Sequence, residues 1–282
     1  MLDPQRLAPH ILTTTDFGPH SERAFFHALA IAVAQQAHMT LLHIGPESRK
    51  EVPWDQYPGV RETLNQWKLL DKGAERTDVA KALGLSVKKF AMRDEDPYNG
   101  TLDYLRKHPT DLLVMATEAR HGLARLRQSS VAQAIAYATN SHALLLPAAA
   151  SNLIDPGSGL RKLRKALFVY DHEPDPRPEL PWLSDWLPKF SEGEIEVHLL
   201  YVGEENEAPD VVLPDQPGLT WKRVAREGVP LKTITGYASE CDADLIVMVN
   251  QRTRGLLGRI RGSLNEQVLR RAGKPMLLLP QH

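Results

Sequence analysis

Two arginine-rich segments carry the residues best suited to bind an anion. Each holds several arginines and then a serine: Arg252, Arg254, Arg259 and Arg261 before Ser263, and Arg120, Arg125 and Arg127 before Ser130. Guanidinium groups match the geometry of phosphate oxygens, and a serine that opens a helix lies beside unpaired backbone N–H groups that favour anions. Two interpretations follow: a solvated surface loop, or an anion site that uses Arg252 and Ser263.

Both serines also fit a structural role. Ser263-Leu-Asn-Glu266 and Ser130-Val-Ala-Gln133 are capping boxes, in which the serine oxygen accepts a hydrogen bond from a backbone N–H of the first helical turn. A helix cap and a phosphate contact are compatible, so both interpretations stay open.

Two aspartates end short apolar segments in corresponding places. His10-Ile-Leu-Thr-Thr-Thr-Asp16 and Lys165-Ala-Leu-Phe-Val-Tyr-Asp171 each read as a strand followed by an acidic residue. Asp16 could bind a ligand, or it could open the turn before a helix that starts at Pro19. Proline-rich residues after Asp171 favour the turn there.

The rest of the chain offers no recognisable catalytic set. Its eleven histidines are scattered and form no pair at metal-ligand spacing backed by carboxylates. Gly273-Lys-Pro275 lacks the hydroxyl residue of a phosphate-binding loop. The single cysteine, Cys241, excludes an internal disulfide and a paired-cysteine metal or redox site. We expect no catalytic residue and no metal site.

The positions of these residues follow from an internal repeat. At a constant offset of 133 residues, positions 111–147 and 244–280 share eleven identities in 37, among them Asp111 with Asp244 and Gly122 with Gly255. Average composition gives about two or three identities by chance. The chain is therefore a tandem duplication of one domain.

Each repeat alternates strands and helices. The apolar runs at residues 112–115 and 245–249 are typical of parallel strands buried on both faces. We predict an α/β fold with two doubly wound parallel sheets, five strands each in the order 3-2-1-4-5. Helices are expected at residues 19–36, 60–83, 98–108, 130–139, 179–189, 230–240 and 263–271.

The predicted domains are residues 1–148 and 165–282, joined by a linker at 149–164. The first domain carries about 22 extra residues, which we place in a helical insertion at 46–83. Pro209, Pro214 and Pro217 in the matching stretch of the second domain argue against a full helix there.

At this point the chain resembles the universal stress protein family, as two tandem family domains. The resemblance is carried by the aspartate that ends the first strand, the Asp-Leu-Ile-Val-Met strand, the Arg-Gly-Leu turn, the Gly-Ser helix start and the closing Lys-Pro-Met-Leu-Leu-Leu-Pro280. It implies that Asp16 and Asp171 contact an adenosine moiety, together with Ile44 and Val202 at the ends of the second strands, Gly262, and the two serines.

ATP-binding members of that family are expected to have a glycine, two residues, a glycine, nine residues, then Gly-Ser or Gly-Thr. Counting back from Gly262, the earlier glycines are replaced by Val249 and Arg252. In the first repeat Ala116, Ala119 and Ser129 occupy all three glycine positions. The ATP motif is therefore degenerate in both domains, more so in the first.

Composition argues against several classes of protein: nucleic-acid-binding, membrane-spanning and secreted. A net charge of −1 argues against a protein that holds nucleic acid by bulk charge. No apolar run approaches the roughly 18 residues that span a bilayer, and the amino terminus lacks the apolar core of a signal peptide. We expect a cytoplasmic protein with no nucleic-acid or membrane partner.

The expected function is a non-catalytic stress-response protein that binds a ligand or partner. The alternative is binding of ATP, ADP or AMP through the second domain; ATP hydrolysis is a third hypothesis, against which stands the lack of a general base or metal-ligand set. The resemblance implies pairing through the last strands. We therefore expect 143–146 and 276–279 to face each other in an intramolecular pseudo-dimer, and a homodimer of whole chains is the further assembly this allows.

Overall fold

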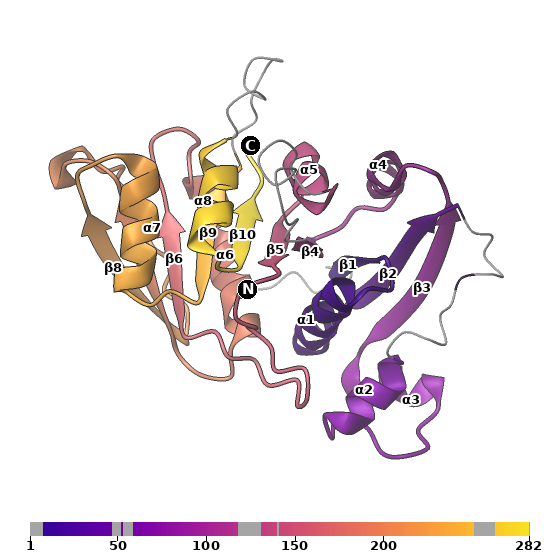
Figure 1. Ribbon diagram of the computed structural model, residues 1–282. Helices are drawn as coiled ribbons and strands as arrows, with labels where there is room; N and C mark the ends of the chain where they lie inside the picture. Colours follow the sequence, from indigo (N-terminus) through magenta and orange to yellow (C-terminus); the bar gives the residue numbers. More distant parts are fainter. Residues whose placement is uncertain are drawn as a thin grey trace. The chain divides into compact units, whose positions relative to one another are not determined.

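The computed structural model describes residues 8–46, 52, 59–117, 131–139, 141–250 and 263–281. These residues cluster into two compact units (Figure 1). Unit 1 is Met1–Ala116 with Ile154–Leu160, and unit 2 is Thr117–Leu153 with Arg161–His282. The end of the first repeat therefore clusters with the second repeat, and the domain limits at 148 and 165 stay a prediction.

The described residues of unit 1 form parallel strands in the order β3-β2-β1-β4. They are β1 (His10–Thr15), β2 (His38–Gly45), β3 (Ser86–Arg93) and β4 (Leu112–Thr117). The middle of β1 pairs on both sides, with Thr13 opposite Leu41 and Val114. β2 is buried from Met39 to Gly45, as expected of a parallel strand covered on both faces, whereas β3 lies at the end of the strand order and exposes Lys88 and Lys89.

The described residues of unit 1 form the helices α1 (Pro19–Gln35), α2 (Val60–Gln66), α3 (Arg76–Leu83) and α4 (Pro97–Lys107). Prolines at the first positions of α1 and α4 suit helix starts, where no N–H partner is lost. The expectation of one helix over residues 60–83 is wrong. Lys68 and Gly73 adopt positive φ angles of 60° and 85°, which no helix accommodates, so the segment forms α2, a turn and α3.

In the part of unit 2 that the structure describes, the strands follow the order β5-β10-β9-β6-β7-β8. They are β5 (Ala143–Pro147), β6 (Lys165–Val169), β7 (Ile195–Tyr201), β8 (Leu219–Ala225), β9 (Leu245–Val249) and β10 (Met276–Leu279). The second repeat alone gives β8-β7-β6-β9-β10, all parallel. This is the predicted order 3-2-1-4-5, and the α/β class is confirmed. β5 pairs antiparallel with β10, Leu144 lying opposite Leu277.

The helices of unit 2 are α5 (Val131–Ala138), α6 (Leu180–Trp186), α7 (Pro230–Glu240) and α8 (Leu264–Ala272). Short 3-10 turns flank α6, at Arg177–Glu179 and Leu187–Phe190. Between β7 and β8 there is only a 3-10 turn, Glu205–Glu207, as the prolines predicted. This segment is held by side chains of β8: Trp221 Nε1 donates to the Pro214 carbonyl at 3.0 Å, and Arg223 donates to the Val211 carbonyl at 2.5 Å.

The repeated aspartates Asp111 and Asp244 lie at the amino ends of the strands. Asp111 Oδ2 accepts a hydrogen bond from the His10 N–H at 2.8 Å. Asp244 Oδ2 accepts from the N–H groups of Arg164 and Lys165 at 2.9 and 3.0 Å. Both therefore fasten the start of a first strand, far along the strand from the carboxyl edge where ligands of such sheets bind.

In the parts of the chain that the structure describes, the helices are too short or too polar to cross a lipid bilayer.

Candidate functional site

The carboxyl ends of the first two strands of each repeat bring the predicted site residues together. Thr15 pairs with His43 in unit 1, so Asp16 and Ile44 follow at the same edge. In unit 2 Val169 pairs with Leu200, which places Asp171 beside Val202 in the same way. The strand registers thus make the two candidate sites equivalent.

Asp16 is fixed by a local hydrogen-bond network. Its Oδ1 accepts from the Gly18 N–H at 2.9 Å and from Ser21 Oγ at 2.7 Å. Ser21 Oγ also lies 3.1 Å from Thr15 Oγ1. The carboxylate therefore opens the turn into α1, as one of the two interpretations predicted, and this leaves its contact with a ligand a prediction.

The same network sets the charge of Asp16. Burial acts to raise the pKa of this carboxyl, but the hydrogen bonds from Ser21 and the Gly18 N–H and the nearby His20 outweigh it and lower the pKa. Asp16 is therefore an anion near neutral pH, which suits a hydroxyl or amine donor on a ligand better than a phosphate.

In each unit, two aromatic rings are in contact at the carboxyl edge of the sheet. In unit 1 the rings of Phe17 and His43 lie 4.6 Å apart, and His43 Nδ1 is 2.8 Å from the Thr15 carbonyl. At the equivalent positions of unit 2, His172 meets Tyr201 edge to face at 6.2 Å. Each of these rings directly follows or precedes a residue that the sequence predicts as a site residue.

In unit 2, the segment after β7 contacts His172 at the carboxyl edge of the sheet. His172 Nε2 lies 2.7 Å from the Glu207 carbonyl, and the His172 N–H donates to Asp171 Oδ1 at 2.7 Å. Burial raises the pKa of Tyr201, and the neighbouring Asp171 and Glu207 raise it further. The tyrosine therefore stays a neutral phenol.

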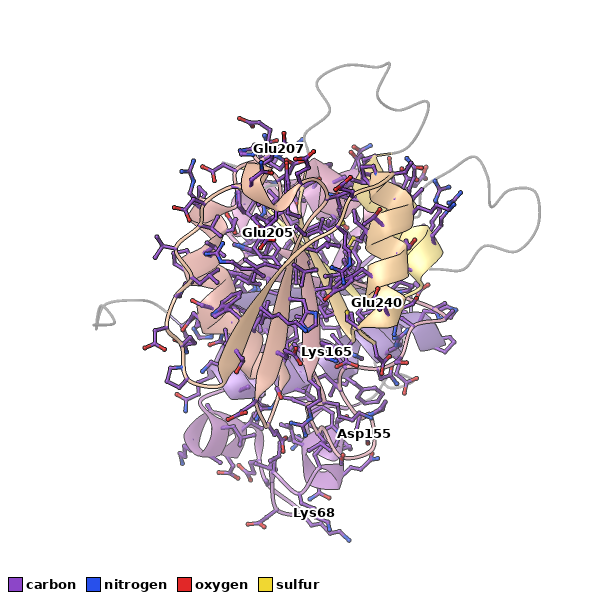
Figure 2. The ribbon with its side chains drawn as sticks, turned by 90° about the vertical axis from the view of Figure 1, so that its left-hand side faces the viewer. Lys68, Asp155, Lys165, Glu205, Glu207 and Glu240 are labelled. Carbon is purple, nitrogen blue, oxygen red and sulfur yellow. The ribbon has the colours of Figure 1, made fainter. Side chains whose placement is uncertain are left out.

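Acidic residues gather beside this edge. Glu204, Glu205, Asn206 and Glu227 line an open hollow of about 700 Å³. Figure 2 shows Glu205 and Glu207 at the carboxyl end of the unit 2 strands and Lys165 at the opposite end. Carboxylates at this edge oppose the approach of a multiply charged anion.

Ser263 is a helix cap, as its sequence predicted. Its Oγ accepts from the Glu266 N–H at 3.2 Å. The next residue but one, Asn265, donates through Nδ2 to the Val249 carbonyl at 3.0 Å, which fastens the start of α8 to the end of β9. Ser263 therefore lies at the same edge of the sheet as Asp171.

A tyrosine from the first repeat lies against this cap within unit 2. Asn250 Nδ2 donates to the Tyr137 carbonyl at 3.3 Å. Burial raises the pKa of the Tyr137 phenol and Glu266 raises it further, while Ser263 acts in the opposite direction. No sequence pattern predicts the contacts of Tyr137, Asn250 or Asn265, because these contacts depend on which helix packs on which strand end.

Several predicted residues lie outside the described part of the chain. These are Ser130, Arg252 and Gly262, with the other arginines of both segments. Anion binding by the arginine-rich segments therefore stays a prediction.

Two observations concern metal binding and the single cysteine. They contain no group of three or more His, Cys, Asp or Glu side chains placed to hold a metal ion. Cys241 is buried, and burial raises the pKa of its thiol, the opposite of what activates a cysteine nucleophile.

Comparisons with known proteins agree on the family. A family model described as the universal stress protein family matches residues 8–147 and 164–280. A universal stress protein from Archaeoglobus fulgidus DSM 4304 is 14% identical with a TM-score of 0.64, covering 97% of each chain. A protein from Pseudomonas aeruginosa UCBPP-PA14, also described as a universal stress protein, is 15% identical with a TM-score of 0.59, covering 97% of this chain and 94% of its own.

The cytoplasmic domain of a prokaryotic cation chloride cotransporter has a similar fold, with 12% identity, a TM-score of 0.50 and coverage of 96% and 95%. The search of curated proteins found no match. At these identities the structural likenesses establish the fold and carry no ligand with them.

Proposed function

The chain belongs to the universal stress protein family as a tandem of two family domains, and on that basis we propose that it acts in a stress response by binding a ligand or partner, without catalysing a reaction. Two features support binding over catalysis. Each unit brings an aspartate and an aromatic pair to its carboxyl edge, and burial raises the pKa of the Cys241 thiol, the opposite of what activates a cysteine nucleophile.

The observation that carries the proposal is the charge at the edge of unit 2. Asp171 follows β6, and the hollow is lined by Glu204 and Glu205, which follow β7, and by Glu227, which follows β8. Val249, which stands at a glycine position of the family's ATP pattern, is a β9 residue with only 6% of its surface exposed. A triphosphate would meet carboxylates and a side chain where it needs bare backbone N–H groups.

The alternative, adenine-nucleotide binding through the second domain, is favoured by one arrangement. Ser263 caps α8 at the same edge as Asp171, and a helix N-terminus favours anions. Weak ATP hydrolysis is a corollary of this alternative only.

A nucleotide series separates the two. Thermal unfolding is measured with adenosine, AMP, ADP and ATP at matched ionic strength. A phosphate-binding site predicts stabilisation that grows with phosphate number and reaches about 2.7 kcal/mol when ligand is 100-fold above Kd. We expect no stabilisation by ATP, and any response to adenosine to weaken as phosphates are added.

Two variants test whether any stabilisation by ATP comes from the second domain's site. Stabilisation by ATP that exceeds that by adenosine, and that Asp171→Asn removes while Asp185→Asn leaves it, would overturn the proposal in favour of the alternative.

We also propose that the two repeats act as an intramolecular pair through their last strands. The antiparallel pairing of β5 with β10 supports this arrangement, since each strand would otherwise leave an apolar sheet edge without a partner. A homodimer of whole chains is then not needed to cover these edges.

A further inference from the structure

The segment between the two repeats is an ordered hairpin rather than a flexible linker. Its tip, Ile154–Leu160, belongs to unit 1. The tip is closed by two backbone hydrogen bonds, from the Asp155 N–H to the Leu160 carbonyl at 2.9 Å and from the Gly159 N–H to the Asp155 carbonyl at 2.8 Å. Asp155 Oδ1 also accepts from the N–H groups of Gly157 and Ser158, both at 3.0 Å.

The tip is seated on unit 1 by apolar contact. Ile154 has none of its surface exposed, and Trp67 has 5%. Trp67 Nε1 donates to the Pro156 carbonyl at 2.9 Å, and its ring lies 6.2 Å from that of Phe26 on α1. Figure 2 labels Asp155 of the tip and Lys68, the residue after Trp67, which both belong to unit 1.

Glycine is required where the tip crosses the tryptophan. Gly159 has a φ angle of +73°, and a Cβ there would lie 2.5 Å from a carbon of the Trp67 ring. The turn Asp155-Pro-Gly-Ser-Gly159 therefore needs glycine at position 159. Any larger residue there would push the tip away from the Trp67 ring.

A buried histidine of α1 completes the seat. His27 has none of its surface exposed. Its Nδ1 lies 2.8 Å from the Arg23 carbonyl, and its Nε2 lies 3.3 Å from the Ile154 backbone nitrogen, which donates to it. A carbonyl can only accept, so Nδ1 carries a hydrogen; a backbone N–H can only donate, so Nε2 carries a lone pair.

The geometry thus allows only the neutral Nδ1–H form of His27 while the tip is seated. We propose that the hairpin tip is a strap that protonation of His27 releases from unit 1. A proton on Nε2 would point at the Ile154 N–H, so the hydrogen bond would become a repulsion between two donors.

Neighbouring charges act on this proton in both directions. On α1 the half-buried Arg23 is a cation whose pKa burial lowers, and it opposes a second positive charge. On the strap, Asp155 favours one, but its carboxylate is held by the turn. The charged residues of α2, Arg61 and Glu62, are exposed and therefore screened by solvent.

The sign of the pH dependence follows from proton counting. The released form binds one more proton than the seated form, so lowering the pH favours release. An exposed histidine titrates near pH 6.5. Below that pH, the equilibrium constant for opening should rise by up to about tenfold per pH unit. This device is independent of any ligand and goes beyond the proposed function.

Hydrogen exchange tests the proposal on the full chain. Exchange of the Ile154 amide is followed from pH 8 to pH 5, corrected for the intrinsic pH dependence of exchange. We expect protection to fall below about pH 6.5 in the natural sequence. His27→Gln keeps a donor and an acceptor but cannot titrate in this range, so its profile should be flat, while His38→Gln, at an exposed histidine, should match the natural sequence.

A second measurement needs no variant at His27. In the imidazole nitrogen NMR spectrum at pH 7.5, His27 should be the neutral Nδ1–H tautomer, and acrylamide quenching of Trp67, assigned with Trp67→Phe, should increase together with release. An Nε2–H tautomer, an imidazolium at that pH, or protection of Ile154 that ignores pH in the natural sequence would each overturn the proposal.

Discussion

Asp111 and Asp244 are identical in the two repeats because each carboxylate fastens the first residue of a strand to its neighbour. Their position at the amino ends separates them from Asp16 and Asp171, which follow the carboxyl ends of β1 and β6. Residue type therefore does not distinguish a structural aspartate from a candidate ligand contact here; the end of the strand does.

Asp244→Ala should lower the free energy of unfolding by about 1–2 kcal/mol, since two backbone N–H groups lose their acceptor. Urea unfolding monitored by circular dichroism measures the change. The control is Asp242→Asn, two residues away, where the side chain is 93% exposed and the φ angle of 51° suits asparagine; a change within about 0.5 kcal/mol is expected. Equal losses in the two variants would contradict the structural role.

At the scale of elements, the insertion of the first repeat shows how one turn divides a helical pattern. Lys68 holds a left-handed conformation with a φ angle of 60° directly after α2. A side chain in that conformation costs free energy that glycine avoids. The apolar spacing of Val60, Leu64 and Trp67 runs up to the turn without marking Lys68 as a break, which is why the pattern predicted one helix.

Lys68→Gly should therefore stabilise the protein by up to about 1 kcal/mol. Lys72→Gly is the matched control, because Lys72 lies in the same connection without a positive φ angle and glycine there only adds freedom to the unfolded chain. Thermal unfolding of both variants compares them directly. A loss of stability in Lys68→Gly would mean that the Lys68 side chain makes contacts that outweigh its backbone strain.

At the scale of the whole molecule, unit 2 joins residues of both repeats. His142, just before β5 of the first repeat, has Nε2 2.7 Å from Oε2 of Glu179 in the second repeat. The His142 ring stacks on Trp182 at 3.5 Å, and Trp182 stacks on Trp186 at 4.8 Å. Glu179 is only 2% exposed, so this contact is desolvated and strong.

His142→Ala should cost about 2 kcal/mol of unfolding free energy, because a buried carboxylate loses one of its partners. A double-mutant cycle with Glu179→Gln should give a coupling above about 0.5 kcal/mol, and His38→Ala, at an exposed histidine, should be neutral. Additive effects would argue against the proposed intramolecular pairing of the repeats.

The sequence alone determined the duplication, the α/β class, the parallel strand order and the capping role of Ser263, because each depends on local spacing or on a repeat that the chain displays directly. It also placed Asp16 and Asp171 at strand ends. It could not decide between turn and ligand contact, since that depends on the orientation of the side chain after the strand has paired.

Only the tertiary structure decided the remaining features. One is the contact of Ile154–Leu160 with His27 and Trp67. Another is the clustering of α5 and β5 with the second repeat. Each joins positions that are distant in sequence. Such contacts arise from packing after the strands have formed, and no local pattern of residue types records them.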